Sequence, residues 1–300
     1  MNCQFITGEN LLHLCEKHDL TIAEVMVRRE CELSHRTADE VRAQMAERLA
    51  VMHSALEKGL TQAPRSVGGL VEGQGKRLNN LPSPLMGGQA AYAAAAAMAI
   101  AEVNAAMGRI IAAPTAGSCG VLPGALFSAA RSFGFDDAAL VEALFVSAAV
   151  GLLIQTNATV SGAEGGCQAE VGAASAMAAA ALTFLQGGSA GASLSAAALA
   201  LQNLMGLVCD PVAGLVEVPC VNRNSIGAVN ALLSADIVLS GTGVMIPFDE
   251  TVDAMYAVGC SLSPALRESA QGGIAATPTA KAAEKSIFAA EQYIPEGLGR

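Results

Sequence analysis

The first sixty residues alternate apolar and polar side chains with helical periodicity. After residue 40 the apolar positions recur every three or four residues, with polar residues between them: Val41, Met45, Leu49, Met52 and Leu56. A threonine followed three residues later by glutamate occurs at 21–24 and again at 37–40. Each pair predicts a helix start closed by a capping box. We therefore predict that residues 1–60 form an N-terminal amphipathic helical segment.

Glycine and proline interrupt the pattern in the next stretch. Residues 61–89 contain nine of them: Pro64, Gly68, Gly69, Gly73, Gly75, Pro82, Pro84, Gly87 and Gly88. This density predicts a long loop without regular structure. Two interpretations stay open, a functional loop and a flexible linker between two helical parts.

From residue 90 onward, alanine-rich apolar runs alternate with glycine- and proline-rich breaks at 113–124, 157–166, 210–224 and 240–249. No regular alternation of strand and helix patterns occurs, which argues against a doubly wound sheet. Ser263-Pro264 predicts a further helix start, and 280–292 a terminal helix. We predict a mainly α fold, in which residues 90–300 form an alanine-rich helical catalytic region whose loops converge on one site. Residues 1–300 are expected to form one domain.

The hydrophobic content is high, at 52% of residues. It comes from short runs at 92–101, 144–154 and 171–185, each shorter than the roughly 20 residues that cross a bilayer. The N-terminus lacks a basic region followed by a long apolar core, so no signal peptide is indicated. We expect buried helices in a cytoplasmic protein, with no membrane partner.

Charge and residue usage exclude several function classes. The chain has 17 basic and 27 acidic residues, a net charge of −10, which disfavours a nucleic-acid partner. All four histidines fall within the first 53 residues. A Ser-His-Asp triad within the later region is therefore excluded, and histidine-containing zinc sites are disfavoured. Only Lys76, Lys281 and Lys285 follow Lys58, and none has the context of a pyridoxal lysine.

The later region is rich in thiols instead. A cytosolic location argues against a disulfide framework. Five of the eight cysteines lie in or beside the breaks: Cys119, Cys167, Cys209, Cys220 and Cys260. Neighbouring glycines and prolines suit a metal–thiolate site, because backbone amides can approach the sulfur atoms. No pair has C-x-x-C spacing. The residues alone do not select among the five, and each could be a small buried side chain.

Four segments then resemble those of the iron–sulfur-dependent L-serine dehydratases. Residues 112–124 are AAPTAGSCGVLPG, similar to the family segment APTAGS-x-G-x-LPG, and residues 162–172 are GAEGGCQAEVG, similar to GAEGGCQ-x-EVG. Residues 209–214 (CDPVAG) and 218–224 (VPCVNRN) resemble CDPV-x-G and VPC-x-x-RN. The intervals of 41 and 10 residues between the three cysteines also fit. The resemblance covers roughly residues 65–290 and agrees with an all-helical catalytic domain.

The resemblance implies that Cys167, Cys209 and Cys220 bind three irons of a [4Fe–4S] cluster. The fourth iron would act as a Lewis acid on L-serine, yielding pyruvate and ammonia. We expect Thr115, Gly117 and Ser118 to bind the substrate, although the same residues could form a helix-capping turn. A second polar group consists of Asn222, Arg223 and Asn224. Arg223 could pair with a carboxylate or anchor its loop. No base for the α-proton is identified.

The resemblance also implies a partner. Single-chain members carry a small α/β domain before the catalytic one, whereas this chain resembles the separate α subunit. A β subunit is therefore expected, contributing polar residues, a histidine among them. Some single-chain members end in a cysteine that reaches the free iron. The last cysteine here is Cys260, so no such cap is expected. The alternatives are another cluster-dependent lyase, such as an L-cysteine desulfidase, and a non-catalytic subunit with a structural cluster or zinc. In the latter, Cys119 or Cys260 would be the fourth ligand.

Overall fold

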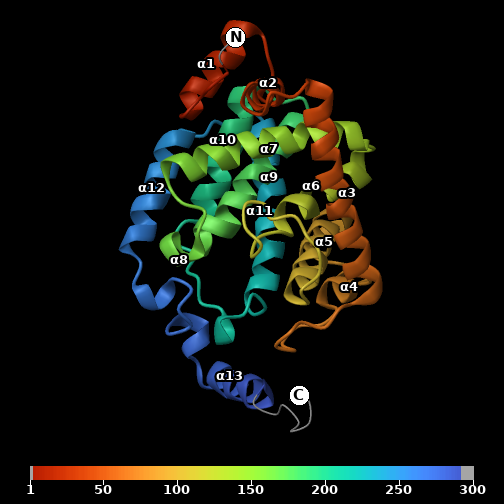
Figure 1. Cartoon of the computed structure of the whole chain (residues 1–300), viewed down its shortest axis with the longest axis vertical. Helices are drawn as coiled ribbons and strands as arrows, with labels where there is room; N and C mark the ends of the chain where they lie inside the picture. Colours follow the sequence, from red (N-terminus) through yellow and green to blue (C-terminus); the bar gives the residue numbers. More distant parts are fainter. Residues whose placement is uncertain (1–2, 292–300) are drawn as a thin grey trace.

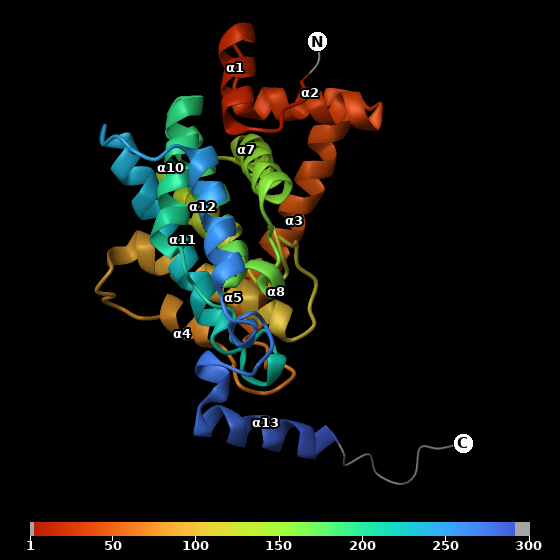
Figure 2. The same ribbon diagram turned by 90° about the vertical axis from the view of Figure 1, so that its left-hand side faces the viewer.

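The computed structural model describes residues 3–291 and is built of helices (Figure 1, Figure 2). Within that range no strand forms, and the only β-type pairings are two isolated bridges, Arg65 with Glu72 and Cys209 with Arg267. The predicted mainly α class is confirmed. Its physical basis is the abundance of alanine, which has the highest intrinsic helix propensity.

Three helices form the N-terminal part: α1 (Gly8–His18), α2 (Ile22–Ser34) and α3 (Ala38–Gln62). Both predicted capping boxes are present. Thr21 N–H donates to Glu24 Oε2 at 2.8 Å, and Glu24 N–H donates to Thr21 Oγ1 at 3.2 Å. The same reciprocal pair joins Thr37 and Glu40. The predicted apolar face of α3 packs into the same core as the later helices: Val41, Met45, Leu49, Met52 and Leu56.

Helix α9 (Ala173–Leu185) forms the centre of the later region (Figure 1). It contacts α6 (Val121–Phe133), α7 (Asp137–Asn157), α10 (Ala190–Leu204) and α11 (Cys220–Leu239). Small side chains let these backbones approach closely. A Cβ on Gly124 of α6 would lie 2.8 Å from the carbonyl oxygen of Ala93 in α5 (Gly87–Ala105).

Two of these core segments have the length and apolarity of membrane spans. Helix α7 is 21 residues long, so the prediction that no apolar segment reaches spanning length is wrong for this helix. The second is Gln168–Leu185, with 18 residues. The helix around the apolar run 144–154 is longer than the run because it includes polar ends. Most of each segment is buried inside the fold, 67% and 83% respectively, as in core helices of soluble proteins.

The glycine-rich stretch 61–89 is more ordered than predicted. Helix α3 continues to Gln62, a short helix α4 (Gln74–Asn79) forms, and α5 begins at Gly87. The expectation of no regular structure is therefore wrong. The stretch is ordered because Gly75 packs closely on α5: a Cβ at Gly75 would be 2.5 Å from the backbone nitrogen of Ala99. That glycine permits close packing of α4 on α5, so it does not mark flexibility.

Two buried carboxylates hold this stretch against the later helices. Glu102 of α5 accepts hydrogen bonds from the N–H groups of Gln74 (2.6 Å) and Gly75 (3.2 Å). Glu217 accepts from Ser66 Oγ, Gly68 N–H and Leu70 N–H at 2.6, 2.6 and 3.0 Å. The stretch is therefore docked on the helical core, unlike a free linker.

The C-terminal part runs along one side of the molecule (Figure 1). It comprises α12 (Phe248–Ser261), two 3₁₀ turns, η3 (Pro264–Leu266) and η4 (Gly273–Ala276), and α13 (Pro278–Glu291). The helix start predicted at Ser263 is confirmed as a cap, since its Oγ accepts from Ala265 N–H, but the element is only one turn. The predicted terminal helix begins earlier, at Pro278, and residue 292 lies outside the described residues.

Candidate functional site

The three cysteines singled out by the resemblance each lie where a helix begins or a segment changes direction. Cys167 joins the short helix α8 (Gly162–Gly165) to a π-helical turn, η1 (Gln168–Gly172). Cys209 pairs through its backbone with the segment around Arg267: its N–H donates to Leu266 O at 2.9 Å, and its carbonyl accepts from Glu268 N–H at 2.7 Å. Cys220 is the first residue of α11.

Cys167 and Cys209 pack in one small buried cluster, and each of them interacts electrostatically with Cys220. Burial raises the pKa of Cys167 to about 11, with a further contribution from Glu170. Burial also raises the pKa of Cys220 to about 12, and the neighbouring Cys167 adds to it. The pKa of Cys209 is raised by burial, by Glu170 and by both other cysteines. Each thiolate would therefore disfavour ionisation of the other two thiols.

Glu170 lies at the edge of this group and was missed as a candidate from sequence. Thr115 Oγ1 donates a 2.6 Å hydrogen bond to Glu170 Oε1, and Cys209 Sγ lies 4.0 Å from Glu170 Oε2. Burial raises the pKa of Glu170, while the Thr115 hydrogen bond lowers it. The sequence feature that could have identified Glu170 as a site residue is its spacing, because it follows Cys167 by three residues, about one helical turn. Its π-helical setting is also common at functional sites.

Glycines make room for this carboxylate. A Cβ on Gly162 would lie 2.6 Å from Glu170 Oε2 and 3.1 Å from Cys209 Sγ. A Cβ on Gly117 would lie 3.0 Å from Glu170 Oε1. Both glycines therefore border the space in which the carboxylate and the thiol meet.

The residues of the predicted substrate-binding loop differ in what they contact. Thr115 and Gly117 face Glu170, as the contacts above show. Ser118 is fully buried behind them, with its Oγ 3.2 Å from Thr115 Oγ1 and 3.4 Å from the carbonyl oxygen of Ala113. Ser118 thus supports the loop from inside, and Thr115 presents its hydroxyl toward the site.

The two asparagines of the second polar group, Asn222 and Asn224, differ in exposure. Asn224 is fully buried, and its amide is fully used. It donates to the carbonyls of Gly117 (2.8 Å) and Cys220 (2.9 Å) and accepts from Gly120 N–H (2.9 Å). It therefore fixes the Thr115 loop to the start of α11. The side chain of Asn222 is exposed. Substrate binding by either asparagine stays a prediction.

Arg223 makes the loop-anchoring contact that the sequence suggested as one possibility. Its Nη1 donates to Val208 O at 2.8 Å and lies 2.8 Å from Asp210 Oδ1. The side chains of Arg223 and Asp210 are 12% and 2% exposed, so this ion pair is largely removed from water. The guanidinium also acts to lower the pKa of Cys167 and of Cys220. Arg223 thus brings a positive charge to the thiol group while holding the chain beside Cys209.

The two other candidate cysteines lie apart from this group. Cys119 is fully buried in the apolar core, and burial alone raises its pKa, to about 12, with no contribution from another thiol. Cys260 is exposed and faces a different cavity, beside α8 and α12. Neither is among the main groups that shift the pKa of the three site cysteines.

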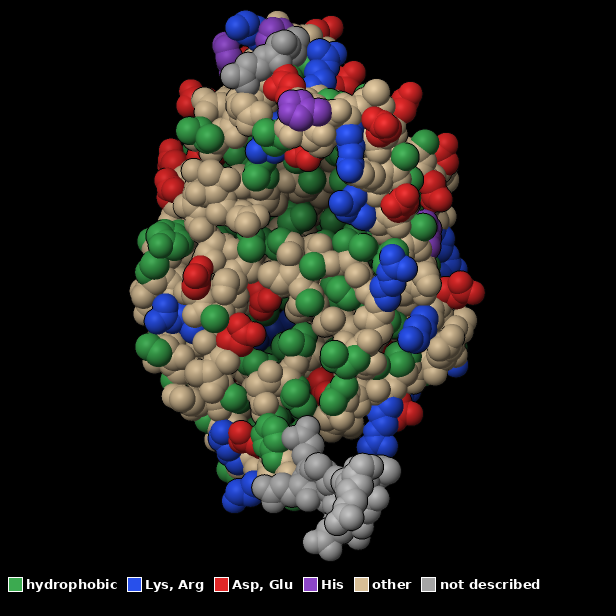
Figure 3. All heavy atoms as spheres, viewed as in Figure 1, with side chains coloured by type: hydrophobic (Ala, Val, Ile, Leu, Met, Phe, Trp, Pro, Cys, Tyr) green, Lys and Arg blue, Asp and Glu red, His purple; other side chains and the backbone are tan. Residues whose placement is uncertain are grey.

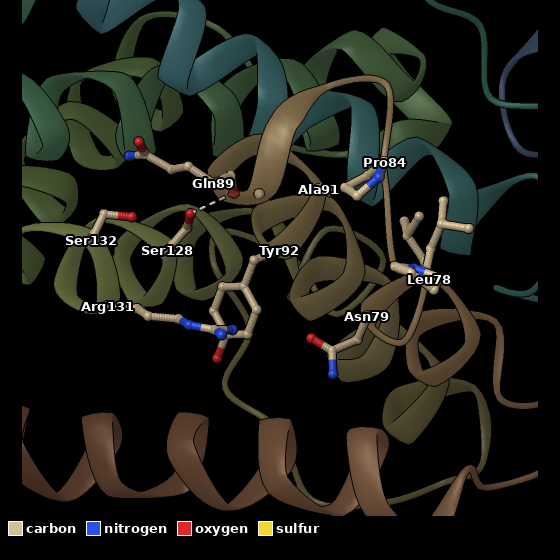
Figure 4. A pocket seen from close by; sticks show the side chains of 12 residues that line it. Leu78, Asn79, Pro84, Gln89, Ala91, Tyr92, Ser128, Arg131 and Ser132 are labelled. Atoms are coloured by element: carbon tan, nitrogen blue, oxygen red, sulfur yellow. Dashed lines mark hydrogen bonds between the residues drawn. The ribbon is translucent and has the colours of Figure 1, made fainter.

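One face of the molecule is hollowed. Figure 3 shows a recess near the middle of the face, at the level of α8 and α11, with acidic and basic atoms inside it. A separate cavity of about 360 Å³ lies between α4, α5 and α6 (Figure 4). There the Arg131 guanidinium stacks on the Tyr92 ring, 4.4 Å from its centroid, and Ser128 Oγ donates to Gln89 O. None of the predicted site residues lines that cavity.

Within residues 3–291, fold and site together define a helical protein in which the buried thiols of Cys167 and Cys209 and the partly buried Cys220 and Glu170 belong to one site. Residues 17–275 match the family model described as Serine dehydratase alpha chain. The chain is 45% identical to the probable L-serine dehydratase, alpha chain, of Bacillus subtilis (strain 168), with 95% of each chain covered. It is 42% identical to the L-serine dehydratase, alpha chain, of Peptoniphilus asaccharolyticus, covering 91% of this chain and 94% of that one. An L-serine dehydratase of Escherichia coli (strain K12) is 34% identical, with 61% of its length covered. The chain belongs to the serine dehydratase alpha chain family.

Proposed function

We propose that this chain is the catalytic α subunit of an L-serine dehydratase, which converts L-serine to pyruvate and ammonia together with a β subunit. The observation that carries the proposal is the meeting of Cys167, Cys209 and Cys220 beside the Thr115–Glu170 pair. These residues come from the four segments that resemble the family. The names of the relatives, including two alpha chains, support the same activity and the need for a partner chain.

The donor set fits a [4Fe–4S] cluster. Three cysteine thiols are the kind of ligand that such clusters use. Among residues 3–291, no three His, Cys, Asp or Glu side chains meet closely enough to hold a single metal ion. A cluster does not require that arrangement, since each thiolate binds a different iron. When bound through three cysteines, the cluster supplies one iron that acts as a Lewis acid on the departing hydroxyl group.

The chain's own residues would bind and orient the substrate. The Glu170 carboxylate is a suitable partner for the ammonium group of serine, because it is the acidic side chain in contact with both Thr115 and Cys209. Thr115 would fix that carboxylate through its 2.6 Å hydrogen bond. Gly117 and Gly162 would keep the space beside it open. Burial strengthens an ammonium–carboxylate pair and also makes an unpaired carboxylate unfavourable, so the site favours a cationic ligand group.

The test is product formation by the anaerobically purified chain, alone and with its β subunit. Pyruvate from L-serine is expected in the presence of β, and sulfide from L-cysteine in its place would establish the desulfidase alternative. Glu170→Gln should raise KM for L-serine strongly. Glu268→Gln, an exposed acid beside the same group, is the matched control and should have a small effect. Absence of pyruvate from an iron-loaded α–β complex would contradict the proposal and favour a structural site.

A further inference from the structure

The cavity that Cys260 lines is separate from the three thiols and is not used by the proposed reaction. It has a volume of about 430 Å³ and is bordered by α8, α12 and the segment after α12. Its polar lining comes from Glu164, Tyr256, Cys260 and Arg267. These residues include both a cation and an anion, and they surround a space large enough for a small molecule and bound water.

The two charged residues have unused hydrogen-bonding capacity. Arg267 Nη1 donates to the carbonyl oxygen of Glu164 at 3.3 Å, but the buried Nε of Arg267 has no hydrogen-bond partner. A buried donor without a partner is rare in folded proteins and calls for an explanation. Glu164 Oε2 accepts from Thr159 Oγ1 at 2.5 Å, and this bond leaves Oε1 for a further donor. An anionic group in the cavity would pair with the positive charge of Arg267, and a cationic group with the exposed carboxylate of Glu164.

We propose that this cavity is a second binding site, separate from the Thr115–Glu170 site, for a free α-amino acid. The guanidinium of Arg267 would pair with the α-carboxylate, the geometry that arginine favours. Glu164 would accept from the α-ammonium group. The exposed ring of Tyr256 and the Pro264 ring would border the side chain.

The cavity is joined to two of the three thiol-bearing segments. Arg267 pairs through its backbone with Cys209. Glu164 lies in α8, three residues before Cys167. The floor between α8 and α12 is tight: a Cβ on Gly259 would lie 2.9 Å from Gly165 Cα. An amino acid spanning Arg267 and Glu164 would therefore clamp the segments that carry Cys167 and Cys209, which gives the site a route to regulate the thiol group.

Cys260 provides a local readout, because it lines the cavity and is exposed. The full chain would be alkylated with iodoacetamide with and without L-alanine, an amino acid that has no hydroxyl group to eliminate. The alkylation rate at Cys260 and at Cys31 would be followed by peptide mass spectrometry. Cys31 is a partly exposed cysteine on α2 and serves as the internal control. At ten times Kd, L-alanine should slow Cys260 alkylation about tenfold and leave Cys31 unchanged.

Two variants separate this site from the reaction site. Arg267→Lys and Glu164→Gln should each reduce the protection of Cys260 by L-alanine, with the helical circular dichroism unchanged. Glu164→Gln changes an exposed side chain, so it tests the site even if Arg267→Lys disturbs folding. Unaltered alkylation of Cys260 at saturating L-alanine would overturn the proposal, as would full protection in both variants. Equal protection by acetate would also overturn it, because the ammonium contact would then contribute nothing.

Discussion

Replacing Glu217 by glutamine should destabilise the chain by removing the anchor of the 66–70 turn. The Glu217 side chain is 2% exposed, and its carboxylate accepts three hydrogen bonds from that turn, at 2.6, 2.6 and 3.0 Å. Glutamine has the same size but only one acceptor oxygen. If that oxygen stays toward Ser66 and Leu70, the new NH₂ group faces the N–H of Gly68, and two donors then oppose each other.

The magnitude follows from the three bonds. A hydrogen bond to a charged group contributes about 1.5–3 kcal/mol, and a neutral one about 1 kcal/mol. Losing one charged bond and weakening the two others gives a loss of about 3 kcal/mol for Glu217→Gln. This is a large part of the roughly 5–15 kcal/mol that stabilises a typical domain. The loss should therefore be well above measurement error.

Urea unfolding measures the difference as a change in midpoint at constant slope. Glu72→Gln is the matched control, because Glu72 lies in the same stretch with its side chain exposed. The free energy of unfolding of the control should remain within about 0.5 kcal/mol of that of the unmodified chain. Hydrogen exchange should also become faster for the amides of Gly68 and Leu70. A Glu217→Gln protein as stable as the control, with unchanged exchange, would refute the reasoning.

Three further outcomes are expected. Gly162→Ala places a Cβ 2.6 Å from Glu170 Oε2, so the amount of iron bound per chain should fall to about half or less. Gly191→Ala is the control, because the nearest atom to its new Cβ would be 3.9 Å away. Its iron content should be unchanged, and its free energy of unfolding should be about 0.5–1 kcal/mol higher. Thr115→Val removes the 2.6 Å hydrogen bond to Glu170, and kcat/KM for L-serine should fall about tenfold to a hundredfold. Burial raises the pKa of Glu102 above its ordinary 4.5, so the folded chain holds that proton more tightly than the unfolded chain. The unmodified protein should therefore lose stability relative to Glu102→Gln as pH rises above 4.5, measured by urea unfolding at about pH 5 and about pH 8; an opposite slope would contradict this assignment.

Local signals predicted the helices well. The Thr21 and Thr37 capping boxes and the alanine-rich runs depend on neighbours within one or two turns, and both appear where the pattern places them. The stretch 61–89 was misjudged because its glycines act over long range. Gly75 permits contact with a helix some twenty residues later, and Glu217 binds the 66–70 turn from roughly 150 residues away. No local pattern contains that information.

The site could be predicted from the sequence only in part. The resemblance selected Cys167, Cys209 and Cys220, and the fold packs Cys167 and Cys209 into one buried cluster. Glu170 was overlooked because its partner Thr115 is 55 residues distant in sequence. Asn224 illustrates the opposite problem. Its position beside a cysteine predicts ligand binding, which stays a prediction, whereas its three internal hydrogen bonds hold the Thr115 loop through contacts that sequence spacing does not reveal.

The central claim is that three cysteines hold a [4Fe–4S] cluster, and iron and sulfide analysis tests it most directly. The chain would be purified anaerobically with its β subunit, and the unmodified protein should contain about four irons and four sulfides per α chain. Cys167→Ser, Cys209→Ser and Cys220→Ser should each lose nearly all of them. Cys119→Ala and Cys260→Ala, matched controls away from the thiol group, should keep them. A full cluster content in any of the three serine variants, or an iron-free unmodified protein that still forms pyruvate from L-serine, would contradict the account.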